Sequence, residues 1–474
     1  MGPQPDRAEG PQGRLVLSRE GAKAKPRSRP ASPAADAPGL AARRAATRLL
    51  AAVVDARTPL DGLTDNEHGH PHYLTLEPRD RALLRAILAT ALRHRNTIAA
   101  LIAARLDRPL PANAHALSHI LHVAAAQMLF LDVPDSAAVD LAVTQARADP
   151  RTARFANLVN AVLREIGRRK ERALPAALAQ TVDAPDWFAT RLRAAYGEEH
   201  AALILAAHRL EPPVDLTVRG DAAGWAERLG GIVLPTGGVR LARLPGPVAE
   251  MRGFAEGEWW VQDAAASIPA RLFGELSGRR VADLCAAPGG KTAQLALAGA
   301  AVTAVEANAN RARRLAANLA RLRLDAEIVV SDLFALKPAE PFDAVLLDAP
   351  CSSTGTVRRH PDVPWTKGLE DVAKLADLQR RMLEAAIPLV RPGGRIVFSN
   401  CSLDPEEGEA LVASLLAERT DVAPDPLRPG EFLFADPFLT GDGAIRTTPA
   451  GLPHQDPGMS GLDGFFAVRL RKPG

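Results

Sequence analysis

The sequence contains few cysteines, and their number and spacing limit the classes to which the protein can belong. Its 474 residues include only three cysteines, at positions 285, 351 and 401, and no two of them have a Cys-x-x-Cys spacing. A disulfide framework or a structural zinc site needs more thiols or closer ones, so we expect neither and no bound metal. So few thiols also favour a reducing compartment, and cytoplasm is the predicted location.

Long apolar runs are missing as well. No stretch of about 18 uncharged apolar residues occurs, so no membrane-spanning helix and no membrane partner are expected. The N-terminus is polar from Met1 onward and lacks the apolar segment of a secretory signal. Hydrophobic residues make up 47% of the chain, enough for real cores, and the length predicts about two to four domains.

A strong excess of charge is absent too. The net charge is +3 and the pI is about 8.9, which alone does not predict nucleic-acid binding. Basic residues are clustered, however, at positions 79–95, 164–172 and 358–360. These clusters are either solvated faces or contacts to a polyanion, and the pattern leaves both interpretations open.

The first part of the chain is predicted to be helical. Residues 1–36 have the composition of a disordered basic tail. Residues 37–175 show apolar spacing of three and four, which predicts an all-α bundle with helices at 41–54, 80–92, 114–130, 136–146 and 154–166. Residues 176–260 predict a smaller linker subdomain, with helices at 185–196 and 198–208 followed by a β-rich segment with glycine turns.

Residues 261–474 have a different pattern, in which strand-like runs alternate with helices. Strands are expected at 281–283, 301–306, 326–330, 342–348 and 395–399, helices at 292–300 and 310–322, and an edge strand at 465–471. Such alternation is typical of a parallel sheet wrapped by helices. The predicted fold class is therefore a multidomain α plus α/β protein with a Rossmann-like C-terminal domain.

A glycine-rich loop, Cys285–Thr292, follows the first of these strands. A phosphate-binding P-loop would need a second glycine where Cys285 stands, and Pro288 removes an amide donor. The dinucleotide motif Gly-x-Gly-x-x-Gly is absent too. A short Pro-Gly-Gly turn after a strand suits a compact ligand such as S-adenosylmethionine, and the strand-end acids Glu306, Asp332 and Asp348 support this interpretation.

Two cysteines follow strand-like runs, where parallel strands present ligand-binding residues. Cys351 comes after Asp348-Ala-Pro, and Cys401 comes after Ser399-Asn. Carbon 5 of a pyrimidine is a poor nucleophile until a thiolate attacks carbon 6, after which it can accept a methyl group. Such an enzyme needs one activated cysteine, and a second thiol nearby can assist release. For Cys285 a small buried residue is the preferred interpretation.

These segments resemble the bacterial RNA cytosine-5 methyltransferases of the Sun (Fmu) family. The resemblance is carried by Asp283–Lys291, by Asp348-Ala-Pro-Cys-Ser, by Thr356–Asp362 with Trp365, by Val261–Ala266 and by Gly461–Phe466. The segment Ala153–Arg164 is similar to the NusB-like RNA-binding bundle of the branch that modifies small-subunit rRNA. The resemblance implies methylation of carbon 5 of one cytosine in 16S rRNA, through a covalent cysteine adduct.

The resemblance also implies a role for individual residues. It implies that Cys401 is the nucleophile, that Cys351 assists breakdown of the adduct, and that Lys291 and Asp348 line the methyl and base site. The residues implied to hold S-adenosylmethionine are Cys285, Ala286, Ala287, Pro288, Gly289, Gly290, Lys291, Glu306, Asp332 and Asp348. Two positions depart from the family pattern: Asn400 replaces a threonine, and Glu306 replaces the more common aspartate.

Several alternatives stay open. The expected partner is 16S rRNA, either naked or in early small-subunit assembly, and the expected state is a monomer. Another RNA, such as a tRNA, could be the substrate. In a DNA cytosine-5 methyltransferase the nucleophile would be Cys351, but a large late target-recognition insert is not visible. A non-catalytic RNA-binding assembly factor is the third alternative, although the cysteines, glycines and strand-end acids are intact.

Overall fold

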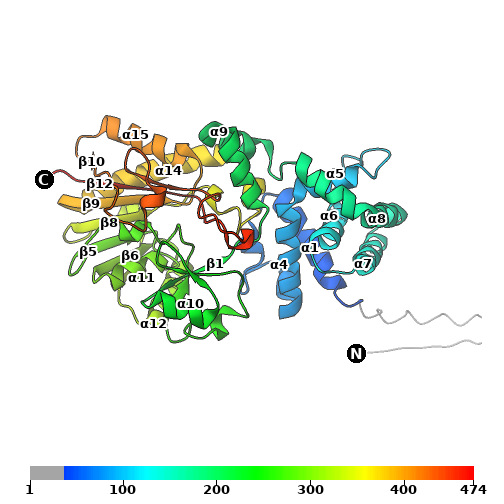
Figure 1. Cartoon of the computed structure of the whole chain (residues 1–474), viewed down its shortest axis with the longest axis horizontal. Coiled ribbons are helices and arrows are strands. Elements are labelled where there is room, and N and C mark those ends of the chain that lie inside the picture. Colours follow the sequence, from blue (N-terminus) through cyan, green and yellow to red (C-terminus); the bar gives the residue numbers. More distant parts are fainter. Residues whose placement is uncertain (1–36) are drawn as a thin grey trace, which may run out of the picture. The chain divides into compact units, whose positions relative to one another are not determined.

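A bundle of helices forms the first part of the computed structural model, which describes residues 37–474 (Figure 1). The predicted tail at residues 1–36 lies outside the described residues. The helices of this part are α1 (Leu40–Val54), α2 (Leu60–Leu63), α3 (Pro71–Leu74), α4 (Pro78–Arg93), α5 (Arg95–Ala103), α6 (His115–Phe130), α7 (Asp135–Ala148) and α8 (Ala156–Gln180). None of the helices within residues 37–474 is both long enough and apolar enough to cross a lipid bilayer.

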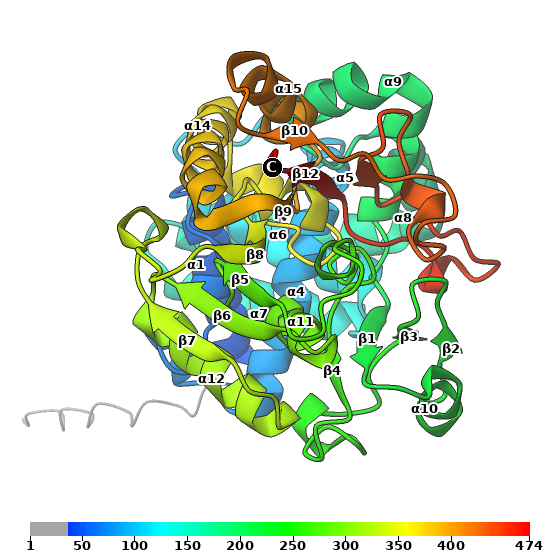
Figure 2. The same ribbon diagram turned by 90° about the vertical axis from the view of Figure 1, so that its left-hand side faces the viewer.

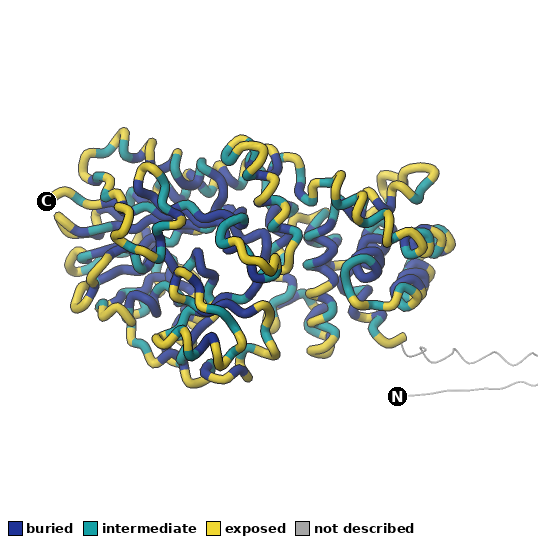
Figure 3. Tube along the Cα trace, in the orientation of Figure 1, coloured by how far each residue is buried: buried dark blue, intermediate teal, exposed yellow. Residues whose placement is uncertain are grey.

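Helix α6 is the centre of the bundle. Most of its residues between Leu117 and Met128 are buried, and they share one core with α1, α4, α7 and α8. A helix that is apolar on nearly all sides must be surrounded by other helices. The buried positions in Figure 3 follow this pattern, and the predicted all-α bundle is confirmed.

A long helix and a small sheet connect the bundle to the C-terminal domain. Helix α9 (Asp186–His208) is kinked at Gly197, where the two predicted helices meet. The small sheet has the order β2-β3-β1-β4 and is antiparallel at all three pairings. Its elements are β1 (Val214–Val218), α10 (Ala222–Leu229), β2 (Ile232–Val233), β3 (Val239–Leu241) and β4 (Trp259–Val261).

The large sheet of the C-terminal part has the order β10-β12-β9-β8-β5-β6-β7, with β11 paired to β12. Strands β5 to β9 run parallel, whereas β12 is antiparallel to β9. The strands are β5 (Arg280–Leu284), β6 (Ala301–Glu306), β7 (Glu327–Val330), β8 (Phe342–Asp348), β9 (Val390–Asn400), β10 (Ala423–Pro424), β11 (Ile445–Thr447) and β12 (Phe465–Arg471). The predicted parallel sheet and a strand at 465–471 are confirmed, but the prediction of an edge strand there is wrong, because β10 and β11 pair with β12 on the side away from β9.

Helices cover both faces of this sheet (Figure 2). On one side lie α11 (Gly290–Leu297) and α12 (Ala309–Leu322), and on the other α14 (Leu369–Ala386) and α15 (Glu409–Glu418). Helix α12 buries Ala312, Leu315, Leu319 and Leu322, whose spacing of three and four defines one face of a helix. The carboxyl ends of β5, β6 and β8 therefore open at one edge of a two-sided α/β layer, the usual place for a ligand.

A short segment after β8 joins the C-terminal domain to the bundle. Trp365, in α13 (Val363–Thr366), packs against the bundle core and donates a hydrogen bond from Nε1 to the Leu92 carbonyl at 3.2 Å. Arg93 donates to the Arg358 carbonyl at 2.9 Å, and the Leu60 amide donates to Asp362 at 3.0 Å. These contacts hold the bundle beside the loop that carries Cys351.

Candidate active site

The glycine-rich loop runs from the end of β5 into α11. Cys285 has a positive φ of 64°, the Ala287–Pro288 peptide is cis, and Gly289 has a φ of 104°. A Cβ atom at Gly289 would lie 2.6 Å from Cδ1 of Leu315 on α12. Only glycine meets both conditions, the left-handed backbone and the close approach. The loop is therefore packed tightly against α12, and its residues also line a cavity.

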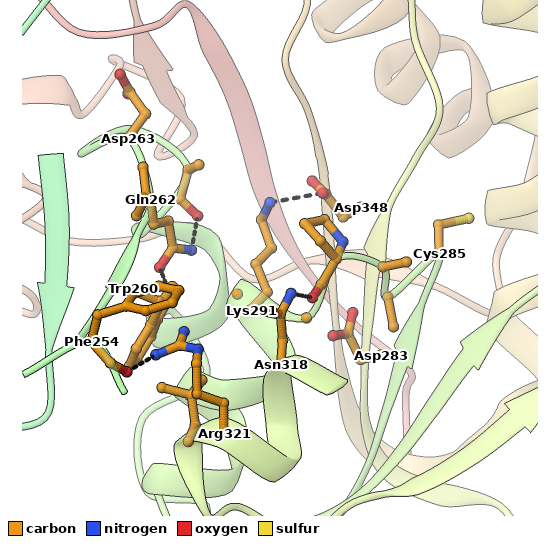
Figure 4. Close-up of a pocket in the computed structure, with 18 of the residues that line it drawn as sticks. Phe254, Trp260, Gln262, Asp263, Asp283, Cys285, Lys291, Asn318, Arg321 and Asp348 are labelled. Carbon is orange, nitrogen blue, oxygen red and sulfur yellow. Dashed lines mark hydrogen bonds and ion pairs between the residues drawn. The ribbon is translucent and has the colours of Figure 1, made fainter. Parts of the chain in front are cut away.

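That cavity has a volume of about 390 Å³ (Figure 4). One wall is the loop itself, Cys285–Lys291, together with Asp283 and Asp348 at the ends of β5 and β8. The opposite wall comes from the small sheet and α12, and includes Phe254, Trp260, Gln262, Asn318 and Arg321. The cavity thus lies between the C-terminal domain and the small sheet, and the sequence-predicted loop forms its floor.

Lys291 and Asp348 face each other across this cavity. Lys291 Nζ lies 2.7 Å from Asp348 Oδ2, and it also lies 5.0 Å from the centre of the Phe465 ring. One oxygen of Asp348 is therefore directed toward the side-chain nitrogen of Lys291. Figure 4 shows the sulfur of Cys285 pointing away from both residues.

Burial governs the protonation of the groups beneath the loop. Burial raises the pKa of Asp283 to about 7, although Thr292 Oγ1 donates a hydrogen bond to it at 2.6 Å. Burial, with the nearby carboxylates, also raises the pKa of Cys285 to about 12. A thiol with so high a pKa is a poor nucleophile at neutral pH, which agrees with a packing role for Cys285.

Cys351 and Cys401 lie next to each other. Strands β8 and β9 are parallel neighbours, with Asp348 opposite Ser399, so the loops that follow them emerge side by side. The two sulfur atoms are 3.3 Å apart and both thiols are free and half-buried. The hydrogen bond from Cys351 lowers the pKa of Cys401, and the same bond, together with burial, raises the pKa of Cys351 well above its ordinary value.

The close approach of the two loops depends on a glycine. The Gly355 amide donates to the Cys401 carbonyl at 2.9 Å, and the Gly464 amide donates to the Gly355 carbonyl at 2.9 Å. A Cβ atom at Gly355 would lie 1.9 Å from the Gly464 carbonyl oxygen. Backbone contact at this distance leaves no room for a side chain, so the glycine permits the two cysteine loops to meet.

Comparison with known proteins identifies the family. A family model described as 16S rRNA methyltransferase RsmB/F matches residues 275–471, and the NusB family model matches residues 40–168. The ribosomal RNA small subunit methyltransferase B of Xylella fastidiosa is 38% identical over 92% of this chain and 98% of its own length. That of Vibrio cholerae is 32% identical over 84% of this chain and 91% of its own length. The chain belongs to the 16S rRNA methyltransferase RsmB/F family.

Solved structures agree with the fold. The structure of PH0851 has a TM-score of 0.67 and 22% identity, and it covers 92% of this chain and all of its own. A methyltransferase homolog from Pyrococcus horikoshii has a TM-score of 0.50 and 29% identity, with 60% of this chain and 94% of its own covered. The predicted resemblance, the NusB-like bundle and the methyltransferase domain are confirmed, and the protein is an rRNA methyltransferase that uses S-adenosylmethionine.

The strand-end acids show how the chain fits this cofactor. Glu306 ends β6 and is buried, with Arg311 at 3.3 Å from Oε2. Within the described residues Oε2 receives no hydrogen bond, so it has an acceptor position left for a ribose hydroxyl. Asp332 follows β7 and accepts a hydrogen bond from the Phe334 amide at 3.0 Å. Neither acid lines the 390 Å³ cavity, whereas Asp348 and the loop do.

The two arginines of the basic cluster at 358–360 lie in different surroundings. Arg358 is only 2% exposed, with Asp263 at 3.4 Å and Asp463 at 3.5 Å. Its guanidinium is therefore paired inside the protein, and for Arg358 both interpretations of this cluster, a solvated face and a contact to a polyanion, are wrong. Arg359 forms an ion pair with Asp463 and also lines the cavity.

Some residues of the site were not predicted from the sequence. Trp260, Asn318 and Arg321 line the cavity from elements far away in the chain. Glu407 and Gln379 lie directly behind the cysteine loops. The sequence contains one signal for a residue such as Glu407. Both cysteines are followed by serine, and buried serine hydroxyls need a hydrogen-bond acceptor nearby.

Proposed function

We propose that the protein methylates carbon 5 of a cytosine in 16S rRNA through a covalent adduct with Cys401. The observation that carries this proposal is the pair of thiols at 3.3 Å with opposite pKa shifts, beside Asp348. A lowered pKa makes Cys401 the more acidic thiol of the pair, which supports its role as the nucleophile. Cytosine 967 is the position that the family resemblance implies.

The chemistry follows from these groups. Cys401 Sγ forms a bond to carbon 6, and the electron pair of the ring double bond moves to carbon 5, which becomes nucleophilic. S-adenosylmethionine would be held by Cys285–Lys291, Glu306, Asp332 and Asp348, and it would supply an electrophilic methyl group that bonds to carbon 5 while its sulfonium becomes a neutral thioether. Removal of the carbon-5 proton by a base re-forms the double bond and expels Cys401 as thiolate. Cys351, the adjacent thiol, assists this last step.

Asp348 and Lys291 orient the base and the methyl donor. The carboxylate of Asp348 can accept a hydrogen bond from the Watson–Crick edge of a cytosine, and the ammonium of Lys291 holds it in place at 2.7 Å. Because duplex RNA hides carbon 5, the target must be splayed out or flipped into the cavity. We further propose a monomeric, cytoplasmic enzyme with a helical RNA-binding region at 37–175, a linker subdomain at 176–260 and a methyltransferase domain at 261–474.

The experiment uses two cysteine variants. Cys351→Ala and Cys401→Ala are incubated with S-adenosylmethionine and small-subunit RNA, and covalent protein–RNA adducts are resolved on denaturing gels. The expected result is an adduct with Cys351→Ala alone, because release fails while attack by Cys401 continues. An adduct with Cys401→Ala alone would assign the attack to Cys351, as in DNA methyltransferases. No adduct from either would contradict the proposal.

Substrate identity is tested separately. Bisulfite sequencing of RNA treated with the wild-type enzyme should show one new 5-methylcytosine in 16S rRNA and none in tRNA. Parallel reactions with naked rRNA and with partly assembled subunits show which form is modified. Methylation confined to tRNA would overturn the rRNA assignment.

A further inference from the structure

Both cysteine loops are fixed to one buried carboxylate. Ser352 directly follows Cys351, and Ser402 directly follows Cys401. Each serine hydroxyl donates a hydrogen bond of 2.5 Å to Oε2 of Glu407. Glu407 itself is 0% exposed, so it lies behind the two loops and out of reach of solvent. One side chain therefore links the residues next to both thiols.

The other oxygen of Glu407 is occupied as well. Oε1 accepts a hydrogen bond from the Ser352 amide at 2.8 Å and another from Gln379 Nε2 at 2.8 Å. None of these four donors carries a charge, and burial raises the pKa of Glu407 against the effect of the hydrogen bonds. A buried acid without a cationic hydrogen-bond partner is costly for stability. Its presence calls for a role beyond holding the fold.

Hydroxyl groups extend the connection between the two loops. Thr354 Oγ1 lies 3.1 Å from the hydroxyls of both Ser352 and Ser402, which are themselves 3.2 Å apart. Thr354 Oγ1 also accepts a hydrogen bond from the Leu403 amide at 2.9 Å. The residues on the C-terminal side of each cysteine thus form one closed, buried network, and neither loop can shift without breaking several hydrogen bonds.

We propose that Glu407 is a positioning residue that sets the separation between the two sulfur atoms by holding both cysteine loops at once. The inference rests on the proposed function, in which the two thiols act as a pair. Glu407 is fully buried and does not line the 390 Å³ cavity, and it acts through Ser352 and Ser402. Without it, Cys351 no longer keeps its hydrogen bond to Cys401, and attack by Cys401 becomes slower because the sulfur is displaced and its pKa rises.

The decisive measurement is the reactivity of Cys401 in the absence of RNA and cofactor. Short pulses of iodoacetamide across a pH series, followed by peptide mass spectrometry, give the pH midpoint for alkylation of Cys401 alone. We expect Glu407→Ala to move this midpoint to higher pH, because the hydrogen bond from Cys351 is lost. Glu407→Gln should move it less than Glu407→Ala does, because the amide oxygen can still accept from both serine hydroxyls, whereas its NH2 group cannot replace Oε1 as the acceptor from the Ser352 amide and Gln379.

A matched control separates positioning from general loosening. Leu415 on α15 is fully buried and takes no part in the hydroxyl network. Leu415→Ala should lower the unfolding temperature without moving the Cys401 midpoint. If it moves the midpoint as far as Glu407→Ala does, or if folded Glu407→Ala keeps the wild-type midpoint, the proposal is wrong. Should Glu407→Ala not fold, the Ser352→Ala, Ser402→Ala double variant removes the same link, and an unchanged midpoint there overturns the proposal.

Turnover provides the second readout. Glu407→Ala should lower kcat by about 100-fold, the usual effect of displacing a reacting group by an ångström, and leave KM for rRNA unchanged. Glu407→Gln should lower kcat less than Glu407→Ala does, because it keeps the acceptor for the two serine hydroxyls. If the wild type transfers no methyl group to RNA, the proposed function fails, whereas the alkylation series still decides the role of Glu407. A raised KM with unchanged kcat would contradict positioning.

Discussion

The Ser399 hydroxyl donates a hydrogen bond of 2.8 Å to Oδ1 of Asp348, the oxygen that Lys291 does not contact. The two residues are direct register partners on β9 and β8. Asp348 is therefore fixed from two sides, by a cation on one oxygen and a neutral donor on the other. Its carboxylate plane is set before a substrate arrives, which is what electrostatic preorganisation requires.

Removal of this neutral donor should weaken catalysis moderately. Ser399→Ala leaves the Lys291 pair intact but frees the carboxylate to rotate, and loss of a hydrogen bond to a charged group costs about 1.5–3 kcal/mol. We expect kcat to fall roughly 10- to 100-fold in a radiolabelled methyl-transfer assay. Ser414→Ala, which removes an exposed hydroxyl bonded to Arg380, is the control and should have no effect. An unchanged kcat in Ser399→Ala would show that Lys291 alone orients Asp348.

The pKa of Cys401 should depend on the donor at position 351. Cys351→Ala removes the hydrogen bond that lowers this pKa, so the thiolate fraction at neutral pH falls and the alkylation midpoint of Cys401 moves to higher pH. Cys351→Ser keeps a donor and should keep the midpoint close to that of the wild type. Equal midpoints in Cys351→Ala and Cys351→Ser would contradict this explanation.

Asp283 should make the stability of the protein depend on pH. Its pKa is about 7 in the folded state and near 3.8 in the unfolded chain, so the folded state binds the proton more tightly. Stability from this group is fully present below about pH 4 and is lost as the pH rises to about 7. The asparagine in Asp283→Asn has no proton to lose between pH 4 and pH 7. The free energy of unfolding of the wild type, relative to that of the variant, should therefore fall by at most about 4 kcal/mol between these pH values. Urea denaturation at pH 5 and pH 8 measures it, and a constant difference would contradict the raised pKa.

Trp365 should stabilise the contact between the C-terminal domain and the bundle. Its ring is partly buried against the bundle core, and its Nε1 donates to Leu92. We expect Trp365→Ala to lower the free energy of unfolding by about 2–3 kcal/mol, and Trp365→Phe by about 1 kcal/mol, for the lost hydrogen bond. Thermal unfolding of the full chain measures both. Equal effects of the two substitutions would mean that packing of the ring contributes little.

The sequence predicted the sheet well because each strand is short, apolar and bounded by turns. The predicted strand at 342–348 coincides with β8, whereas β9 begins at Val390, five residues before the predicted start. Its first part contains Pro392 and two glycines, which are poor strand formers, and pairing across the sheet overrides that preference. Helix α14 was not predicted, although its buried residues have helical spacing.

The site was predictable only in part. Cys351 and Cys401 could be placed together because both follow parallel strands, which end at the same edge. The hydrogen-bond partners of Asn400 could not be predicted. Its side-chain amide donates to Gln379 Oε1 at 2.9 Å and to the Glu407 carbonyl at 2.7 Å. The asparagine that replaces the family's threonine is therefore hydrogen-bonded within the network behind the two cysteines. Gln379 lies on α14, and contacts between elements so far apart depend on packing that no local pattern encodes.

Cys401, the proposed nucleophile, directly follows strand β9, which is hydrogen-bonded along both edges, to β8 and to β12. An interior strand cannot swing out of a sheet without breaking two ladders, so Cys401 stays where the fold puts it. All the travel needed for bond formation must then be made by the nucleotide. The enzyme holds its reacting thiol in place. The free energy needed to reach the reactive geometry therefore depends on how easily the RNA loop that presents the base can deform.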